Sequence, residues 1–214
     1  WNAVERMGFK GGTVLEPGMG IGHFLGMMPP DLAAKSKYQG LELDHLTAQI
    51  AKLLYPDGTL QHAGVILGVG GVASHVFSRL SQKDHGYFAR AHLTQGLSAV
   101  TAACLVVRKS VFLEVGGLNE EALKVAYNDV DFCLKVQKAG YQNVYCPDAL
   151  LYHHESVSRG QEDTPEKKLR FEQERAYMLD SWSDIIANDP AYNPNLSLTG
   201  TNFELAYPPR TAPF

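Results

Sequence analysis

The stretch that decides the fold is Asn128-Asp129-Val130-Asp131-Phe132-Cys133-Leu134-Lys135, which runs on to Ala139-Gly140-Tyr141. Asn is a good N-cap residue, acidic residues favour the positive end of a helix dipole, and glycine commonly follows a helix C-terminus. We therefore expect a helix from Asn128 to Ala139, capped by Asn128 and ended by Gly140. Its first turn carries two carboxylates, Asp129 and Asp131.

Two interpretations of these carboxylates are open from the residues alone. Capping and dipole complementarity account for most isolated Asn-Asp-x-Asp segments. Alternatively, a carboxylate held at the edge of a pocket is a general base, which takes the proton from an attacking hydroxyl group.

Further elements are expected on both sides of this helix, and together they predict an α/β chain. Helices are expected at Ser110 to Val115, at Thr164 to Ile186, and at His45 to Tyr55 with Leu46, Ile50, Leu53 and Leu54 on one face. Strands are expected at Thr13 to Glu16, Tyr38 to Leu43, Ala99 to Arg108, Tyr141 to Cys146 and Ala149 to Tyr152. We expect irregular loops at Gln61 to His75, which is rich in glycine, and from Asn188 onward.

The composition excludes several classes of protein. Of the 214 residues, 45% are hydrophobic and 20% charged, and the net charge is −4. Without a basic stripe we expect no nucleic-acid binding, and without a long apolar run we expect no transmembrane segment. The chain opens at Trp1 without a basic-then-apolar leader, which predicts no signal peptide and a start that has been cut away.

Cysteine usage points to a reducing compartment. Cys104, Cys133 and Cys146 are few and odd in number, and they lie in apolar segments. We expect buried free thiols, and the absence of a CxxC pair argues against a cysteine zinc site.

A glycine-rich turn, Glu16-Pro17-Gly18-Met19-Gly20-Ile21-Gly22, follows the first expected strand. Glycines there let the backbone approach a nucleotide, and an acid at the end of the next strand can accept both ribose hydroxyls. Glu42 lies 20 residues beyond Gly22 and suits that role. A tight turn that binds no ligand is the alternative.

With Gly40-Leu41-Glu42-Leu43-Asp44, this turn resembles the S-adenosylmethionine motif of adenine-specific DNA methyltransferases of the helicase–methylase type. The resemblance covers residues 1–56. It implies Glu16, Gly18, Gly20 and Gly22 around the methionine part and Glu42 on the ribose. The family's catalytic tetrapeptide, Asn/Asp-Pro-Pro-Tyr/Phe, is absent, so we expect no methyl transfer, and S-adenosylmethionine only if this fragment is functional.

The remainder, residues 57–210, resembles family 2 glycosyltransferases, which are inverting enzymes with a GT-A fold. The resemblance rests on linked motifs in order: Tyr55 to Gly64, Thr101 to Phe112, Val115 to Glu120, Asn128 to Leu134, Ala139 to Tyr141, Tyr152 to Ser156, and Asp189 to Ser197. It implies a nucleotide-diphospho-sugar donor, a saccharide or lipid-linked acceptor, and a divalent metal, Mn²⁺ or Mg²⁺. It also implies polysaccharide or O-antigen assembly in the cytoplasm, with peripheral association at the inner membrane face as an alternative location.

The same resemblance assigns roles to individual residues. Asp129 inherits the role of general base and Asp131 a supporting or acceptor-side role. His153 or His154 occupies the position of a histidine near the metal and diphosphate, although a surface or packing role is the alternative. Arg159 could meet a phosphate oxygen, or be a solvated loop charge.

The donor-binding half of a GT-A domain has no counterpart before Gly58. The tripeptide Asp129-Val130-Asp131 matches the pattern of the metal motif Asp-x-Asp, but it occupies the position of the family's general base. We therefore expect a partial GT-A domain preceded by a Rossmann-like βαβ fragment, joined at Tyr55-Pro56-Asp57, with a tail at residues 211–214. The alternatives are a methyltransferase fragment with an unrelated tail, or a non-catalytic fusion of the two.

Overall fold

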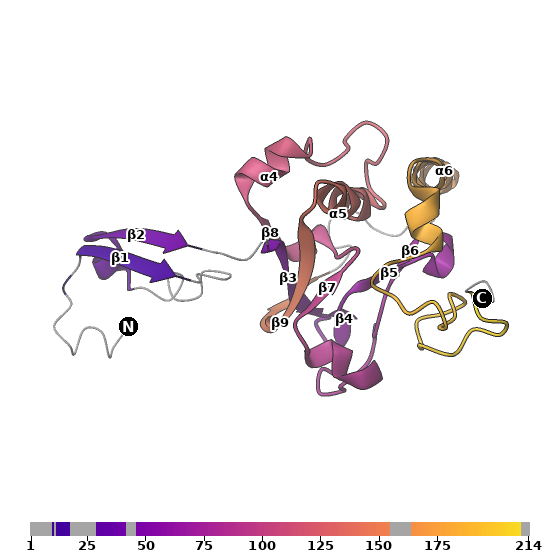
Figure 1. The fold of residues 1–214 in the computed structure, drawn as a ribbon, viewed down its shortest axis with the longest axis horizontal. Coiled ribbons are helices and arrows are strands. Elements are labelled where there is room, and N and C mark those ends of the chain that lie inside the picture. The colour runs from indigo at the N-terminus through magenta and orange to yellow at the C-terminus, as the bar shows by residue number, and fades with distance from the viewer. Residues whose placement is uncertain (1–9, 11, 18–28, 42–45, 155–163, 211–214) are drawn as a thin grey trace. The chain divides into compact units, whose positions relative to one another are not determined.

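A computed structural model of the chain describes residue 10 and residues 12–17, 29–41, 46–154 and 164–210 (Figure 1). The chain forms two compact units, Trp1–His45 and Leu46–Phe214. The joint expected at Tyr55-Pro56-Asp57 therefore lies inside the second unit, because the strand that precedes it belongs to the second unit's sheet.

The first unit contains two parallel strands, β1 (Gly12–Pro17) and β2 (Ser36–Leu41), paired along their whole length. A short helix, α3 (Pro30–Ala33), precedes β2. Both predicted strands are confirmed. Parallel strands need a crossover connection, so their pairing agrees with a βαβ-like arrangement.

The second unit is built on a five-stranded mixed sheet in the order β4-β3-β9-β7, with β8 also paired to β3. Its central pair is β3 (Leu46–Leu54) and β9 (Gln142–Tyr152), which run parallel. The antiparallel partners are β4 (Leu60–His62), β7 (Gln95–Leu97) and β8 (Leu105–Val107).

The helix predicted at His45 to Tyr55 was wrong, because this segment forms strand β3. Its described side chains, Ala51 to Leu54, are all buried. A strand buried on both faces carries a nearly continuous apolar run, which periodicity alone does not separate from a buried helix. The apolar spacing therefore did not distinguish a helix from a strand at Leu46, Ile50, Leu53 and Leu54.

The segment Gln61 to His75, predicted to be an irregular loop, contains most of three short strands. After β4 comes a hairpin of β5 (Val65–Leu67) and β6 (Ala73–His75) around the 3-10 turn η1 (Val69–Gly71). Gly68 before that turn has φ +82°, and a Cβ there would lie 2.7 Å from the Ile186 carbonyl oxygen. Glycine is therefore required by both conformation and space.

The strand predicted at Ala99 to Arg108 is shorter than expected. Ala99 forms an isolated antiparallel bridge to Val65, the 3-10 turn η3 (Ala102–Cys104) follows, and only β8 forms a ladder with another strand. Thr101 begins that turn by accepting a hydrogen bond from the backbone N–H of Ala103. Strand β7 and the irregular 3-10 segment η2 (Tyr87–His92) were not predicted.

The two strands predicted at Tyr141 to Cys146 and Ala149 to Tyr152 form one strand, β9, with a bulge. Its register against β3 moves from Ala51 opposite Cys146 to Lys52 opposite Leu150. Residues 147–149 are therefore extra on β9, and Pro147 among them lacks the N–H that a regular ladder needs.

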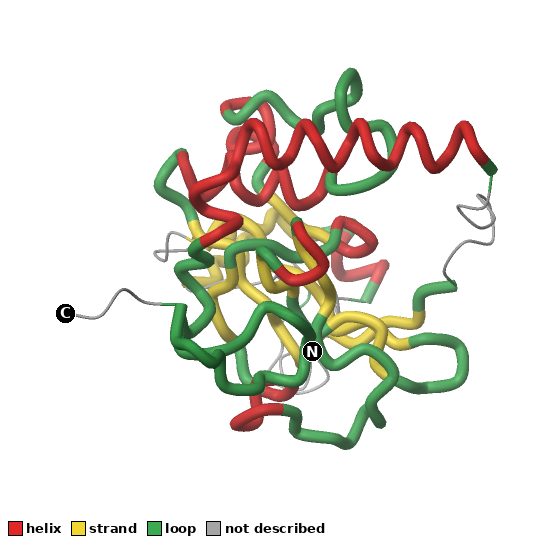
Figure 2. The backbone as a smooth tube through the Cα atoms, turned by 90° about the vertical axis from the view of Figure 1, so that its right-hand side faces the viewer, coloured by secondary structure: helices red, strands yellow, loops and turns green. Residues whose placement is uncertain are grey.

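Three helices of the second unit lie on the same side of its sheet, α4 (Lys109–Glu114), α5 (Asn128–Lys138) and α6 (Pro165–Ala187), as both views show (Figures 1 and 2). All three were predicted and are confirmed. Thr164 caps α6 by accepting a hydrogen bond from the Lys167 N–H, and Trp182 interrupts its regular geometry.

The expected cap of α5 was wrong. Asn128 is the first helical residue, and the residue before it, Tyr127, adopts a left-handed conformation with φ 60° and makes no side-chain cap. The predicted acids of the first turn are present, as is the positive-φ glycine, Gly140, after the last turn.

The tail beyond α6 is loop-like, as predicted, and a buried carboxylate, Asp189, joins it to the hairpin and to the segment after β7. Asp189 accepts hydrogen bonds from the backbone N–H groups of Leu67 and Ala191 and from the Ser98 hydroxyl. The side chain is 4% exposed. One residue thus connects β5, the segment after β7 and the tail.

The three cysteines are free thiols, as expected, but only Cys133 is fully buried. Burial raises the pKa of the Cys133 thiol, and its Sγ donates to the Val100 carbonyl oxygen. A thiol in this state is unreactive. Cys104 and Cys146 are half-buried, contrary to the prediction.

Candidate functional site

A small cavity lies where the C-terminal ends of β3 and β9 meet the hairpin. Its volume is about 120 Å³, and its lining combines hydroxyl, imidazole and amide groups. The lining residues are Leu53, Tyr55, Gln61, His75, Ser78, Thr101, Ala103 and His153. This mixture of neutral donors and acceptors suits a ligand rich in hydroxyl groups.

Asp129 is attached to one wall of this cavity. Its Oδ2 accepts a hydrogen bond from the Ala102 N–H at 3.2 Å, between the lining residues Thr101 and Ala103. Its Oδ1 accepts from the Val130 N–H at 2.9 Å. Each carboxylate oxygen has a further lone pair, so the half-buried Asp129 can accept further hydrogen bonds.

Asp131, two residues later, has different surroundings. It is 1% exposed, and its Oδ1 accepts from the Trp182 indole N–H at 2.9 Å. Its Oδ2 lies 3.1 Å from the Lys135 Nζ, which also donates to the Gly117 carbonyl oxygen. These contacts join α5 to α6 and to the turn after α4.

His153 is one of the two histidines named by the sequence, and it lines the cavity. Its backbone N–H donates to the Leu54 carbonyl oxygen at 2.8 Å, so β3 and β9 fix its position. Its Nδ1 lies 2.8 Å from the Gln61 Oε1. The neighbouring His154 is exposed and does not line the cavity.

Sequence reasoning missed several lining residues, although four of them stood in motifs quoted for the resemblance. Tyr55 and Gln61 belong to the motif Tyr55 to Gly64, and Thr101 and Ala103 to the motif Thr101 to Phe112, but no role was assigned to them. Arg79 was also missed: its guanidinium carbon lies 3.7 Å from the centroid of the Tyr55 ring, and it pairs with Asp57 at 3.4 Å. A cation therefore stands beside the cavity lining.

His75, which lines the cavity, contacts a second histidine, the buried His62. The Nδ1 atoms of His62 and His75 are 2.9 Å apart, so one ring donates and the other accepts. His62 is fully buried, and its ring also meets that of Tyr145 edge-on. Burial, and then the neighbouring His75, lower the pKa of His62 well below its ordinary value.

We expect His62 to make folding sensitive to acid. The pKa of an unfolded histidine is about 6.5. Below that pH His62 is protonated in the unfolded chain but stays neutral in the folded chain. Its contribution to stability is therefore complete above about pH 6.5 and falls below it by up to about 1.4 kcal/mol per pH unit. Urea unfolding at about pH 8 and about pH 5.5 measures this.

His62→Phe should lose less stability than the wild type over that interval. The exposed His154→Gln is the control and should behave as the wild type. An equal loss in all three proteins would assign the acid sensitivity to other groups.

Several predicted site residues lie outside the described part of the chain. These are Gly18, Gly20, Gly22, Glu42 and Arg159. Glu16 is the last residue but one of strand β1, and only its backbone is described. The expectation of S-adenosylmethionine binding therefore stays a prediction from the sequence.

The described side chains do not by themselves form a ligand set that suits a divalent metal ion. No group of three or more His, Cys, Asp or Glu side chains among them is placed to hold an ion. The cavity offers imidazoles, hydroxyls and an amide, whereas Mg²⁺ and similar hard cations prefer sets of oxygen ligands that include carboxylates.

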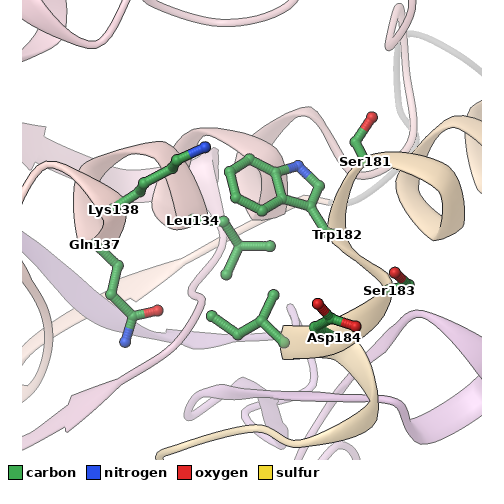
Figure 3. Close-up of a pocket in the computed structure, with 8 residues that line it drawn as sticks. Leu134, Gln137, Lys138, Ser181, Trp182, Ser183 and Asp184 are labelled. Carbon is green, nitrogen blue, oxygen red and sulfur yellow. The ribbon is translucent and has the colours of Figure 1, made fainter.

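A larger cavity of about 410 Å³ lies between α5 and α6. Figure 3 shows Lys138 reaching toward Trp182 across it, with Ser183 and Asp184 on the α6 side. The Lys138 Nζ lies 5.8 Å from the centroid of the Trp182 ring. This cavity borders the C-terminal half of α5, whereas Asp129 lies in the first turn.

Comparison with known proteins gives relatives over most of the chain. It is 56% identical over 158 residues, 74% of its length, to the uncharacterized protein y4gI of Sinorhizobium fredii. It is 36% identical over 160 residues, 71% of its length, to the O-antigen biosynthesis protein RfbC of Myxococcus xanthus. The matched regions are 17% and 12% of those two proteins, so the chain corresponds to a small part of each.

A shorter match covers 63 residues, 29% of the chain, at 38% identity. The relative is the N-acetylglucosaminyl-diphospho-decaprenol L-rhamnosyltransferase of Mycobacterium tuberculosis, of which 20% is matched. No known family profile and no solved structure matches the chain. The named relatives support a glycosyltransferase-like family at modest identity, and none of these three names supports the methyltransferase resemblance.

Within the described residues, no helix is long and apolar enough to cross a bilayer.

Proposed function

We propose that residues 57–210 form the acceptor-side half of an inverting family 2 glycosyltransferase with a GT-A fold. The observation that carries this proposal is the hydrogen bond from the Ala102 N–H to Asp129, which holds a carboxylate against the wall of a hydroxyl-rich cavity. The rhamnosyltransferase and O-antigen names of the relatives support the same reaction class.

In this reaction Asp129 acts as the general base. A hydroxyl of the saccharide or lipid-linked acceptor attacks the anomeric carbon of a nucleotide-diphospho-sugar, and Asp129 takes the hydroxyl proton. The carbon–oxygen bond to the diphosphate breaks, the nucleoside diphosphate leaves with the bonding electrons, and the anomeric configuration inverts. Asp131 supports the base by tying the start of α5 to Trp182 and Lys135.

The donor half of the enzyme is proposed to pack where β9 ends. Leu150, Leu151 and Tyr152 are successive residues with exposed fractions of 48%, 44% and 58%. Successive side chains of a strand point to opposite faces, so both faces of the sheet are uncovered there. Exposed apolar side chains at a strand end next to His153 fit an interface with the nucleotide-binding half.

This arrangement predicts that the isolated chain binds nucleotides weakly. Calorimetry of the chain with UDP or dTDP plus Mn²⁺ should give no binding in the micromolar range, because the described residues offer no metal-binding clamp for a diphosphate. The complete parent enzyme, rebuilt with its donor half, should bind one of these nucleotides and transfer its sugar.

Clear micromolar binding by a monodisperse sample of the isolated chain would place the donor site within it and contradict the proposed division. A rebuilt enzyme that binds nucleotide-sugars but transfers no sugar from any UDP- or dTDP-linked donor to a hydroxyl acceptor would contradict the proposed reaction.

A further inference from the structure

The contact between Gln61 and His153 determines which imidazole nitrogen carries the proton. The Nδ1 of His153 lies 2.8 Å from the Gln61 Oε1. An amide oxygen only accepts hydrogen bonds, so the Nδ1 must carry the hydrogen and donate it. Gln61 is 7% exposed and follows the buried Leu60 in β4, which keeps its amide in place.

The other nitrogen of His153 is thereby left as an acceptor. A neutral imidazole carries one ring hydrogen, so a hydrogen on Nδ1 leaves a lone pair on Nε2. Among the residues that the structure describes, no hydrogen-bond partner is found for this Nε2, and the ring lines the cavity. The described residues therefore leave this lone pair to a molecule that enters the cavity.

We infer that Gln61 is a positioning residue, which holds His153 as a hydrogen-bond acceptor for a hydroxyl group of the saccharide substrate. This inference rests on the proposed function for the identity of the ligand, but the state of the imidazole does not depend on it. A hydroxyl group fits the rest of the wall, where Tyr55, Ser78 and Thr101 carry hydroxyls that can each donate one hydrogen bond and accept others.

Gln61 also lines the cavity, but the role inferred for it is to position His153. Its effect is transmitted through the ring of His153, in the way that outer partners of a ligating histidine set its tautomer and orientation. The bond spans 92 residues of sequence and links β4 to the end of β9. Both ends of the contact are therefore fixed by the same sheet that carries the cavity.

The test is nitrogen-15 NMR of the imidazoles in the full 214-residue chain. At about pH 8 free histidine is neutral, so only the tautomer is measured. The spectrum of His153→Gln identifies the His153 resonances by their loss. In the wild type we expect a protonated Nδ1 and an unprotonated Nε2.

Two substitutions of Gln61 separate its hydrogen bond from its packing. Gln61→Glu keeps an acceptor oxygen at the same reach and should preserve the wild-type tautomer. Gln61→Met keeps the length and removes the acceptor, and the hydrogen should then redistribute toward Nε2. A wild-type spectrum with a protonated Nε2, or an unchanged tautomer in Gln61→Met, overturns the inference. The wild-type spectrum tests the inferred tautomer of His153 even if Gln61→Met does not fold.

The rebuilt complete enzyme adds a second measurement. Gln61→Met should lower kcat/KM for the acceptor by about 10- to 100-fold, the range seen when an outer partner of a metal-ligating histidine is removed. Gln61→Glu should recover most of this loss. Equal activities of wild type and Gln61→Met, with the tautomer changed as expected, would contradict a role for His153 in substrate binding. Absence of transfer by the wild type would instead count against the proposed function, and leave the tautomer result standing.

Discussion

Replacing Asp129 by Asn in the complete parent enzyme should reduce the rate of sugar transfer by about 100- to 10,000-fold, the usual range for loss of a general base. The amide keeps an oxygen that accepts from the Ala102 N–H, so the start of α5 should hold its shape. It does not take a proton from the acceptor hydroxyl. Initial rates with a radiolabelled nucleotide-sugar measure the effect.

Asp131→Asn is the matched comparison within the same turn. Asp131 is buried against Trp182 and Lys135 rather than bonded to the cavity wall, so its substitution should cost less activity and more stability. The exposed Asp148→Asn should leave the rate unchanged. Comparable rates for wild type and Asp129→Asn would remove the base assignment and restore helix capping as the role of this carboxylate.

Replacing Asp189 by Ala should destabilise the second unit by about 3 kcal/mol or more, since each donor deprived of a buried partner costs about 1–3 kcal/mol. The carboxylate serves two backbone N–H groups and the buried Ser98 hydroxyl. For a chain of this size that loss lowers the melting temperature by roughly 6–12 °C. Thermal unfolding followed by circular dichroism measures it.

Asp189→Asn should give an intermediate loss, because the remaining carbonyl oxygen still accepts while the amide nitrogen does not. Asp180→Ala, at an exposed position of α6, is the control and should stay within about 0.5 kcal/mol of the wild type. A melting temperature of Asp189→Ala equal to that of the control would show that the tail is not held by this carboxylate.

Local elements with clear ends could be predicted from the sequence. Helix α6 has a Thr164 cap and a proline at its first position, and the acids and glycine around α5 defined its extent. The place of Asp129 in the first turn of α5 followed directly. Such features depend on residues within a turn of one another, so the order of residues is enough to reveal them.

Strand β3 could not be predicted in this way. Its apolar spacing suits a helix equally well, and it becomes a strand because β9 pairs along it while β4 and β8 flank its other edge. These partners come from later parts of the chain. Pairing between distant segments overrides a local pattern that fits two structures.

By itself, the sequence determined the class of fold, the helices α4 to α6, the strands β1 and β2, and the carboxylate pair at the start of α5. The tertiary structure decided what surrounds that pair: Asp129 meets Ala102, 27 residues away, Asp131 meets Trp182, 51 residues away, and His153 meets Gln61, 92 residues away. The physical reason is that hydrogen bonds over such separations depend on how strands and helices pack, whereas a cap or a turn depends only on neighbouring residues.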